Sequence, residues 1–501
     1  MTTRWGMVID LQKCIGCLGC VDVCKEVNFS PDGASWREVH GYQAGAGFSA
    51  PSLSLPMNCM HCSDAPCLEV CPTTATFRHA DGIVDMHEDI CIGCGYCMVA
   101  CPYFARTISH SDRIIDMVAE NGAANSSVGV ATKCNFCRPR LEYGLAQGLE
   151  IGVAPAATPS CVAYCTGKAL HFGDLGDSNS RVSRLVNENE TFQLQEDLGT
   201  GPVVHYLVGK AVEELPGNGQ VELLPSRHQT VWHWPAVANF LLGGLAAGFF
   251  LASLLIGSAA ELGWLAPLLA SLGFGSLTLE AGHPWRSIHL LRHLKSSWMS
   301  REALAGMFFI GLGLLNWLAP NLLLAWGTAV SGTLLLISQG FMVYRARAVA
   351  AWNTRRLLGQ FVTAGLAGGF ALALLIWSES SSLPLLTAAL VVLDLAAWLY
   401  YLYASGDEAF QKGVRPLQQP QSLLWTIGLG RVLPLLLLVA TTVLTNASPL
   451  FSIIAAVLLV FGSIAQKAGV ILRAGSLRAI QMNRYNTQKD RSSGLALPYQ
   501  P

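Results

Sequence analysis

Four runs of four cysteines are the residues of this chain whose spacing could do chemistry. The runs that begin at Cys14 and at Cys91 share one pattern, C-x2-C-x2-C-x3-C. Three thiolates two residues apart can hold one iron–sulfur cube, and the fourth can ligate a second cube. Sixteen thiolates are enough for four [4Fe-4S] clusters. The runs are Cys14, Cys17, Cys20 and Cys24 (run one); Cys59, Cys62, Cys67 and Cys71 (run two); Cys91, Cys94, Cys97 and Cys101 (run three); and Cys134, Cys137, Cys161 and Cys165 (run four).

Zinc is the alternative, because isolated C-x2-C pairs usually bind it. Runs one and three carry three cysteines at two-residue intervals plus a fourth, which zinc sites rarely use. The N-terminus has no apolar signal region, so the cysteines indicate metal in a reducing compartment rather than disulfides. His61, inside run two, is a possible ligand. Since the thiolates already fill four sites, a packing role or a hydrogen bond beside a ligand is favoured.

The second half of the chain supplies the elements that would hold these clusters beside a membrane. Hydrophobic residues make up 52% of the chain and charged residues only 13%. An aromatic stretch at Trp232 to Pro235 is typical of a membrane interface. Eight apolar segments follow, each near the ~20 residues that a spanning helix needs. They cover residues 235–258, 262–280, 303–319, 321–341, 358–377, 384–404, 423–445 and 449–472.

The charges predict an orientation. The connections after predicted helices one, three, five and seven (near Ala259, Pro320, Ser380 and Asn446) contain no Lys or Arg. The other connections and the tail are basic, so the positive-inside rule predicts that the cluster domain and both termini face the cytoplasm. The formal net charge of −1 argues against nucleic acid as a partner. The basic residues are Arg286, Arg292, Lys295, Arg301, Arg345, Arg347, Arg355, Arg356, Lys412, Arg415, Arg473, Arg478, Arg484, Lys489 and Arg491.

Ionisable residues at the predicted helix ends are candidates for quinone chemistry. A quinone exchanges two protons along with two electrons, so its site needs such groups beside the nearest cluster. The alternative is that these residues lie at the interface and orient the helices, which explains most of the arginines. The candidates are Glu280, His283 and Glu302 for proton handling, and Arg286, His289 and Arg301 for the quinone pocket. Inside helices six and seven, Asp394 and Arg431 favour a structural ion pair over a proton path.

The first half resembles the four-cluster iron–sulfur subunit of the DMSO reductase family of molybdenum enzymes. The cysteine runs carry the resemblance, together with Cys71-Pro-Thr-Thr-Ala, Asp81-Gly-Ile-Val, Cys101-Pro-Tyr and Phe172-Gly-Asp-Leu. The resemblance implies that the runs share clusters in pairs. The implied ligand quartets are Cys14, Cys17, Cys20 with Cys165; Cys134, Cys137, Cys161 with Cys24; Cys59, Cys62, Cys67 with Cys101; and Cys91, Cys94, Cys97 with Cys71.

The second half resembles the eight-helix anchor subunit of the same enzymes. The match lies in Gly282-His-Pro-Trp-Arg, in the stretch from Lys295 to Glu302, and in Tyr344-Arg-Ala-Arg and Ala351-Trp-Asn-Thr. The family often places a quinol-site histidine two residues before the Gly of Gly-x-Pro. This chain has Glu280 there and His283 three residues on, so the resemblance leaves the proton-handling group open.

Together these patterns predict a fused electron-transfer and anchor chain. An α+β, ferredoxin-like, duplicated [4Fe-4S] domain covers residues 1–175, a docking segment and linker 176–230, and an all-α polytopic membrane domain of eight transmembrane helices 231–501. The resemblance implies a separate large catalytic subunit with a molybdenum or tungsten bis-pterin cofactor, and electron exchange with membrane quinone. It favours a cytoplasm-facing, sulfite dehydrogenase-like complex. The alternatives are a DMSO, S-oxide or N-oxide reductase that oxidises menaquinol, a redox-linked proton pump, or a passive scaffold.

Overall fold

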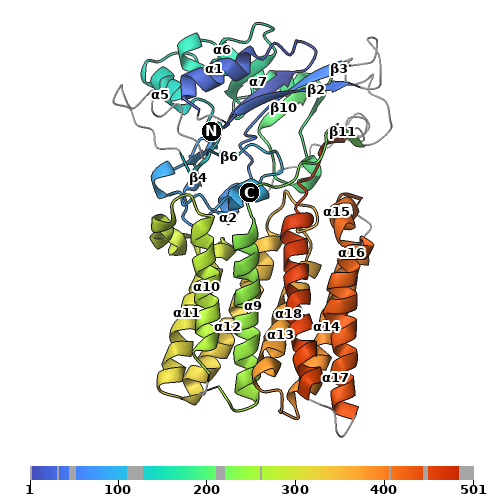
Figure 1. Cartoon of the computed structure of the whole chain (residues 1–501). Coiled ribbons are helices and arrows are strands. Elements are labelled where there is room, and N and C mark those ends of the chain that lie inside the picture. The colour runs from blue at the N-terminus through green and yellow to red at the C-terminus, as the bar shows by residue number, and fades with distance from the viewer. Residues whose placement is uncertain are drawn as a thin grey trace.

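An α+β domain sits on one end of a helical bundle in the computed structural model (Figure 1). The structure describes residues 3–30, 33–43, 52–109, 128–209, 220–259, 262–404, 408–443 and 449–483. Of the basic tail residues, Arg484, Lys489 and Arg491 lie outside these ranges, as does the connection at Asn446.

A four-stranded sheet in the order β8-β1-β10-β9 forms the centre of the α+β domain. The fully buried β1 (Trp5–Asp10) pairs antiparallel with β8 (Leu170–Asp174) and parallel with β10 (Val204–Leu207). β9 (Thr191–Phe192) completes the sheet. Because β9 and β10 hydrogen-bond into the same sheet as β1, the segment expected to be a linker from residue 176 is in its first part a component of the cluster domain.

Each cysteine run leads into a short helix, and two-stranded hairpins separate the runs. The helices are α1 (Gly19–Asn28), α2 (Pro66–Val70), α3 (Tyr96–Ala100) and α6 (Ser160–Ala163), with α5 (Arg138–Ala146) and α7 (Arg181–Glu188) between and after them. The hairpins pair β2 (Arg37–Gln43) with β3 (Ser52–Asn58), β4 (Thr76–Arg78) with β5 (Val84–Met86), and β6 (Thr107–Ile108) with β7 (Ala131–Thr132).

The repeated Cys-Ile-Gly-Cys openings of runs one and three have one backbone shape. Gly16 and Gly93 both have φ of +69°, a left-handed conformation that glycine adopts without strain. This local identity agrees with two dicluster halves that derive from one repeat.

Seven helices are long and apolar enough to cross a membrane in the described part of the chain. The segment predicted at 262–280 gives only α10 (Leu265–Ser276) and a short turn to Leu279. The chain then bends by 112° into η5 (Pro284–His293), so the count is eight only if this bent pair is one span. Proline and glycine around Gly282 break the helix here. The seven spans are α9 (Trp234–Leu255), α11 (Trp298–Leu318), α12 (Leu322–Tyr344), α13 (Arg356–Ile376), α14 (Leu383–Tyr403), Pro420–Val443 (α16, η7 and α17) and Pro449–Arg473 (α18 and η8).

Ion pairs and backbone hydrogen bonds dock the cluster domain onto the bundle. Arg347 pairs with Asp64 at 3.0 Å and with Glu69 at 3.1 Å, and Arg345 pairs with Glu69 at 2.6 Å. The buried Tyr96 hydroxyl donates to the Met342 carbonyl at 2.6 Å. The basic connections therefore lie on the same end of the bundle as the cluster domain.

The C-terminal tail also returns to this end. β12 (Ile480–Asn483) pairs with β11 (Gln220–Leu224), which precedes the first spanning helix. Lys412, in the short α15 (Glu408–Val414), lies 3.8 Å from Glu222 of β11. The segments that precede and follow the bundle in the sequence therefore pair with each other beside the cluster domain.

Candidate functional site

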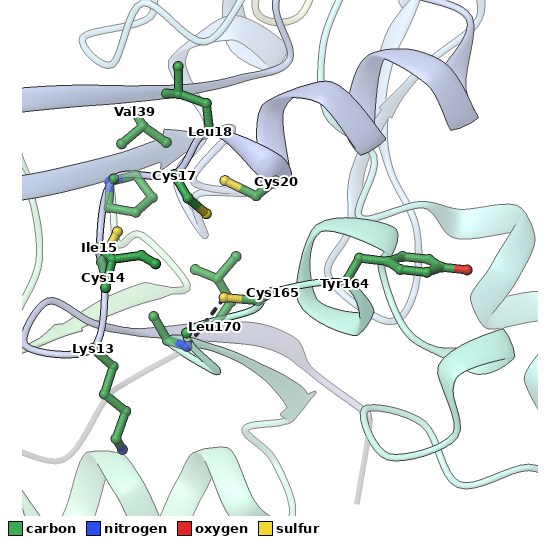
Figure 2. A pocket seen from close by; sticks show the side chains of 14 residues that line it. Lys13, Cys14, Ile15, Cys17, Leu18, Cys20, Val39, Tyr164, Cys165 and Leu170 are labelled. Carbon is green, nitrogen blue, oxygen red and sulfur yellow. Dashed lines mark hydrogen bonds between the residues drawn. The ribbon is translucent and has the colours of Figure 1, made fainter.

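The thiols of run one meet a thiol of run four in a pocket far from the bundle. Cys14, Cys17, Cys20 and Cys165 line this pocket, and their sulfur atoms face a shared space (Figure 2). The Ala169 amide donates to Cys165 Sγ at 3.3 Å. Amide donors of this kind stabilise the thiolate form that ligates iron.

A second pocket contains the complementary quartet. It is lined by Cys134, Cys137 and Cys161 of run four and by Cys24 of run one. Asn28 Nδ2 lies 3.6 Å from Cys24 Sγ and 3.8 Å from Cys137 Sγ, so one amide reaches two thiols of this group.

Runs two and three exchange their fourth cysteines in the same way. Cys62 interacts electrostatically with Cys59, Cys67 and Cys101. Cys94 interacts with Cys91 and Cys97 of its own run and with Cys71 of run two. The structure thus brings the sixteen thiols into the four groups that the family resemblance implies.

The geometry suits a cube better than one metal ion. In the described residues, no group of three or more His, Cys, Asp or Glu side chains is placed to hold a single ion, as zinc requires. The second pocket also contains buried donors without a protein acceptor, Trp36 Nε1 and Arg37 Nε and Nη2. Buried donors are rarely left unpaired, and the sulfides of an iron–sulfur cube would accept from them.

Burial alone opposes thiolate formation in these pockets. Burial, with a smaller contribution from neighbouring thiols, raises the pKa of Cys24 and of Cys101 to about 12. Thiols with such a pKa stay protonated at neutral pH unless a cation holds the thiolate form, which bound iron would do.

His61 contacts protein groups from both dicluster halves. Its Nδ1 accepts from the Val84 amide at 3.1 Å, and its ring stacks on Phe136 at 3.8 Å between centroids. Burial lowers the pKa of His61, so its ring is neutral. These contacts fit the packing role that was favoured over ligation.

Comparison with known proteins identifies the cluster domain. Residues 6–72 and 52–117 match two family models described as a 4Fe-4S dicluster domain. A protein of Halobacterium salinarum, named as a dimethyl sulfoxide reductase iron–sulfur subunit, is 37% identical over 224 residues, which are 42% of this chain and 80% of the relative. This chain belongs to the family of iron–sulfur subunits of DMSO reductase-type enzymes.

Two further relatives of this iron–sulfur subunit serve different reductases. A selenate reductase subunit of Mesobacillus selenatarsenatis is 37% identical over 221 residues, 41% of this chain and 72% of the relative. The arsenate respiratory reductase iron–sulfur subunit of a Shewanella species is 35% identical over 236 residues, 41% of this chain and 96% of the relative. The two family models lie within the cluster domain, and each relative matches about two fifths of this chain. The chain also contains a helical domain with seven helices long and apolar enough to cross a membrane in its described part.

A cavity of about 250 Å³ lies where the cluster domain meets the bundle of this iron–sulfur subunit. Cys94 of run three lines it, and Trp232 Nε1 donates to the Cys94 carbonyl at 3.2 Å. Glu280 and Glu302 line the same cavity, along with apolar groups that include Phe240 and Met342. An apolar cavity with two carboxyl groups beside a predicted cluster ligand is suited to a quinone headgroup.

Glu302 is the more enclosed of the two carboxyl groups, at 1% exposure. Its Oε1 accepts from Asn239 Nδ2 at 2.9 Å and from Gln339 Nε2 at 3.2 Å. The described residues give Oε2 no hydrogen bond. Two amides from α9 and α12 therefore hold the carboxyl group of α11 in place at the cavity wall.

The other predicted quinone-site residues contact backbone groups outside the cavity lining. His283 Nε2 lies 2.8 Å from the Val128 carbonyl, and Arg286 Nη1 donates to the Cys91 carbonyl at 2.9 Å. Arg301 donates to the Leu294 and Lys295 carbonyls, which follow η5, and stacks over Trp298. His289 is half-buried within η5. None of these four residues lines the cavity, and His283 and Arg286 instead hold η5 against the cluster domain.

Sequence reasoning missed three polar groups of this site: Asn239, Gln339 and the indole of Trp232. The first two were detectable in principle, because uncharged amides inside apolar helices are themselves unusual and need partners. Trp232 was assigned to the membrane interface, whereas it is 3% exposed and bridges the cavity to run three.

Asp394 and Arg431 form a buried ion pair, each side chain 1% exposed. Arg431 Nη2 lies 2.8 Å from Asp394 Oδ2, and Thr363 donates to Asp394 Oδ1 at 3.1 Å. Gln466 accepts from Arg431 as well. The ion-pair interpretation is confirmed. The buried Lys467 lies close to this pair, with its Nζ 3.2 Å from the centroid of the Phe361 ring.

We expect Asp394→Leu to destabilise the bundle by about 3–5 kcal/mol, because it leaves the Arg431 charge buried without a partner. The double variant Asp394→Leu/Arg431→Leu should recover most of this loss, since removing both charges removes the unpaired one. Thermal unfolding of the detergent-solubilised chain measures both. A single variant as stable as the parent would contradict the structural role.

Asp394→Asn in vesicles tests the alternative proton path, which predicts loss of proton translocation.

Proposed function

We propose that this chain carries electrons through four [4Fe-4S] clusters between a separate molybdenum or tungsten bis-pterin catalytic subunit and membrane quinone. The observation that supports this most is the cavity at the domain junction. One thiol of the run-three quartet, Cys94, and the enclosed carboxyl group of Glu302 line the same space. A cluster and a proton-handling group would therefore contact one bound molecule.

The four quartets follow one another across the domain. Arg37 interacts with both Cys20 and Cys161, which indicates that the quartet of Cys20 lies next to the quartet of Cys161. Cys134 of that second group interacts with Cys59 of run two. Cys97 of run three interacts with Cys67. Bound cubes accept and release single electrons, so this succession would conduct from the far pocket to the cavity.

The pocket farthest from the bundle is surrounded by exposed apolar side chains. Ile15 is 70% exposed, Tyr164 62% and Leu18 48%, and all three line this pocket together with the exposed Cys17. Exposed apolar groups of this size around a redox centre suit a protein partner. We assign this face to the catalytic subunit, with Cys17 near the centre of the contact.

At the cavity, the chain's own residues position and deprotonate the quinol. Asn239 and Gln339 fix Oε1 of Glu302, which leaves Oε2 to take a proton from a quinol hydroxyl or return one to a quinone. Glu280 lies nearer the surface, where it accepts from the His233 amide. Glu302 and then Glu280 would pass the proton to water on the cluster-domain side.

We place the cluster domain in the cytoplasm, with a sulfite dehydrogenase-like partner that sends electrons to quinone. The basic connections on that end support the orientation, and the described connections at the opposite end contain no Lys or Arg. The second candidate is a reductase complex that oxidises menaquinol. The names of the relatives, which include dimethyl sulfoxide, selenate and arsenate reductases, favour it.

Metal analysis and quinol titration of the purified chain test the proposal. We expect about sixteen irons per chain, four for each cube, and reduction of the clusters by a menaquinol analogue. Stoichiometric zinc would overturn the cofactor assignment, and iron-loaded clusters that no quinol or quinone can reach would favour the passive scaffold. Sulfite added to the complete complex should reduce quinone; reduction of S-oxides at the expense of quinol would select the second candidate.

A further inference from the structure

One arginine is buried among the thiols of runs one and four, and another among the thiols of runs two and three. Arg37 opens β2 and is 2% exposed, and Arg106 follows run three and is 3% exposed. In the described residues, neither forms an ion pair with a carboxylate. A guanidinium is always charged in proteins, and burying it is costly unless negative charge surrounds it.

Arg37 lies between the quartets of runs one and four. Its Nη1 donates to Asn58 Oδ1 at 3.0 Å and lies 3.7 Å from Cys161 Sγ. It also interacts electrostatically with Cys20, which belongs to the neighbouring group. Its Nε and Nη2 have no protein acceptor and line the pocket of Cys161.

Arg106 has the corresponding place between the quartets of runs two and three. Its Nη2 donates to Cys67 Sγ at 3.0 Å, and Nη1 donates to Thr76 Oγ1 at 3.1 Å. It interacts electrostatically with Cys97 of the neighbouring group as well as with Cys67. Its Nε is buried without a protein acceptor.

Two other cations near the thiols are engaged differently. Lys133 donates to the Cys134 carbonyl at 2.7 Å, and Arg78 donates to the Cys62 carbonyl at 2.6 Å. Both side chains donate to backbone carbonyl oxygens rather than to sulfur atoms. Arg37 and Arg106 are thus distinguished by contact with the sulfur atoms themselves, each beside two quartets.

We propose that Arg37 and Arg106 are positioning residues that set the electron affinity of the two clusters each one separates. This inference rests on the proposed function, because it requires cubes at the four quartets. A cube gains one negative charge on reduction, so a fixed guanidinium against its sulfurs stabilises the reduced form and raises the reduction potential. One arginine for each pair keeps the two clusters of a pair close in potential, so that electrons pass between them readily.

Redox titration of the full chain, followed by electron paramagnetic resonance, tests this with crossed variants. Arg106→Gln should lower the potentials of the run-two and run-three clusters and leave the other pair unchanged. At a fixed solution potential, we expect the ratio of reduced to oxidised cluster to fall roughly tenfold or more, the effect of losing a charged hydrogen bond. Arg37→Gln should lower the potentials of the other pair, the run-one and run-four clusters, and leave those of runs two and three unchanged. Each variant is therefore the control for the other. Arg106→Lys keeps the positive charge and should bring the potentials of the run-two and run-three clusters most of the way back to those of the parent chain.

Iron analysis separates failure of this inference from failure of the proposed function. Parent chain without iron overturns the function and the inference with it. Full iron with unchanged potentials in both Gln variants, or an equal shift of all four clusters, overturns the inference alone. If Arg106→Gln loses iron only from the run-two and run-three clusters and Arg106→Lys retains it, the positive charge is needed there and the inference stands. Loss of iron from both variants would show a purely structural role for the side chain and overturn the inference.

Discussion

Glu302→Gln is expected to slow quinone-linked turnover by about 100-fold or more, the usual contribution of a positioned acid or base. Glutamine keeps the size of the side chain and can still contact Asn239, but it cannot take or return a proton. Reduction of the clusters by an artificial dye should be unchanged, because dyes bypass the cavity. Stopped-flow oxidation of a menaquinol analogue by the iron-loaded chain measures the first rate, and dye bleaching measures the second.

The matched control is Glu379→Gln, the same change at a carboxyl group in the connection after α13, outside the cavity lining. It should leave both rates unchanged. Glu280→Gln should slow the quinone-linked rate less than Glu302→Gln, since Glu280 lies closer to the surface. Normal quinone kinetics in both cavity variants would remove proton handling from this site and favour the passive scaffold.

Cys94→Ser is expected to disconnect quinone from the rest of the clusters. The substitution removes a proposed ligand of the cluster beside the cavity, so iron should fall by roughly one to four atoms per chain. The remaining clusters should still respond to dye, whereas a menaquinol analogue should no longer reduce them. Low-temperature spectra of the quinol-treated and dye-treated chain show the difference directly.

Cys17→Ser is the informative partner of this variant. Cys17 belongs to the pocket of Figure 2, next to α1, which lies on the side of the domain away from the bundle (Figure 1). It should lose a similar amount of iron, yet quinol should still reduce the clusters of runs two and three. If quinol reaches the clusters equally well in both variants, the electrons do not enter beside Cys94 and the order of the clusters is wrong.

The sequence predicted the class of this protein because the decisive pattern is local. Thiols two and three residues apart are held near one another by the chain itself, so the spacing alone indicates iron–sulfur ligation. The lengths of apolar segments are equally local, and seven of the eight predicted segments form helices of spanning length. The exception is the segment predicted at 262–280, whose helix is too short to span because the chain bends at Gly282 and Pro284, residues that break a helix.

The tertiary structure decided which polar side chains share a space. Arg286, Arg301 and Glu302 look alike as ionisable residues near helix ends, but only Glu302 lines the cavity. The arginines instead donate to backbone carbonyls, Arg286 to Cys91 of the docked domain and Arg301 to Leu294 just after η5. A helix period does not tell which neighbour an ionisable side chain will meet, and that neighbour determines whether it handles protons or holds two domains together.

The same division applies to the cluster domain. Local spacing predicted sixteen thiols as ligands, and the family resemblance predicted how the runs exchange their fourth cysteines. The burial of Arg37 and Arg106 between quartets depends on β2, run three and run four converging, contacts that span up to 124 residues of sequence. Chain composition and motif spacing determined that this protein handles electrons beside a membrane; only long-range packing determined which charges surround them, because such contacts form between segments that share no local pattern.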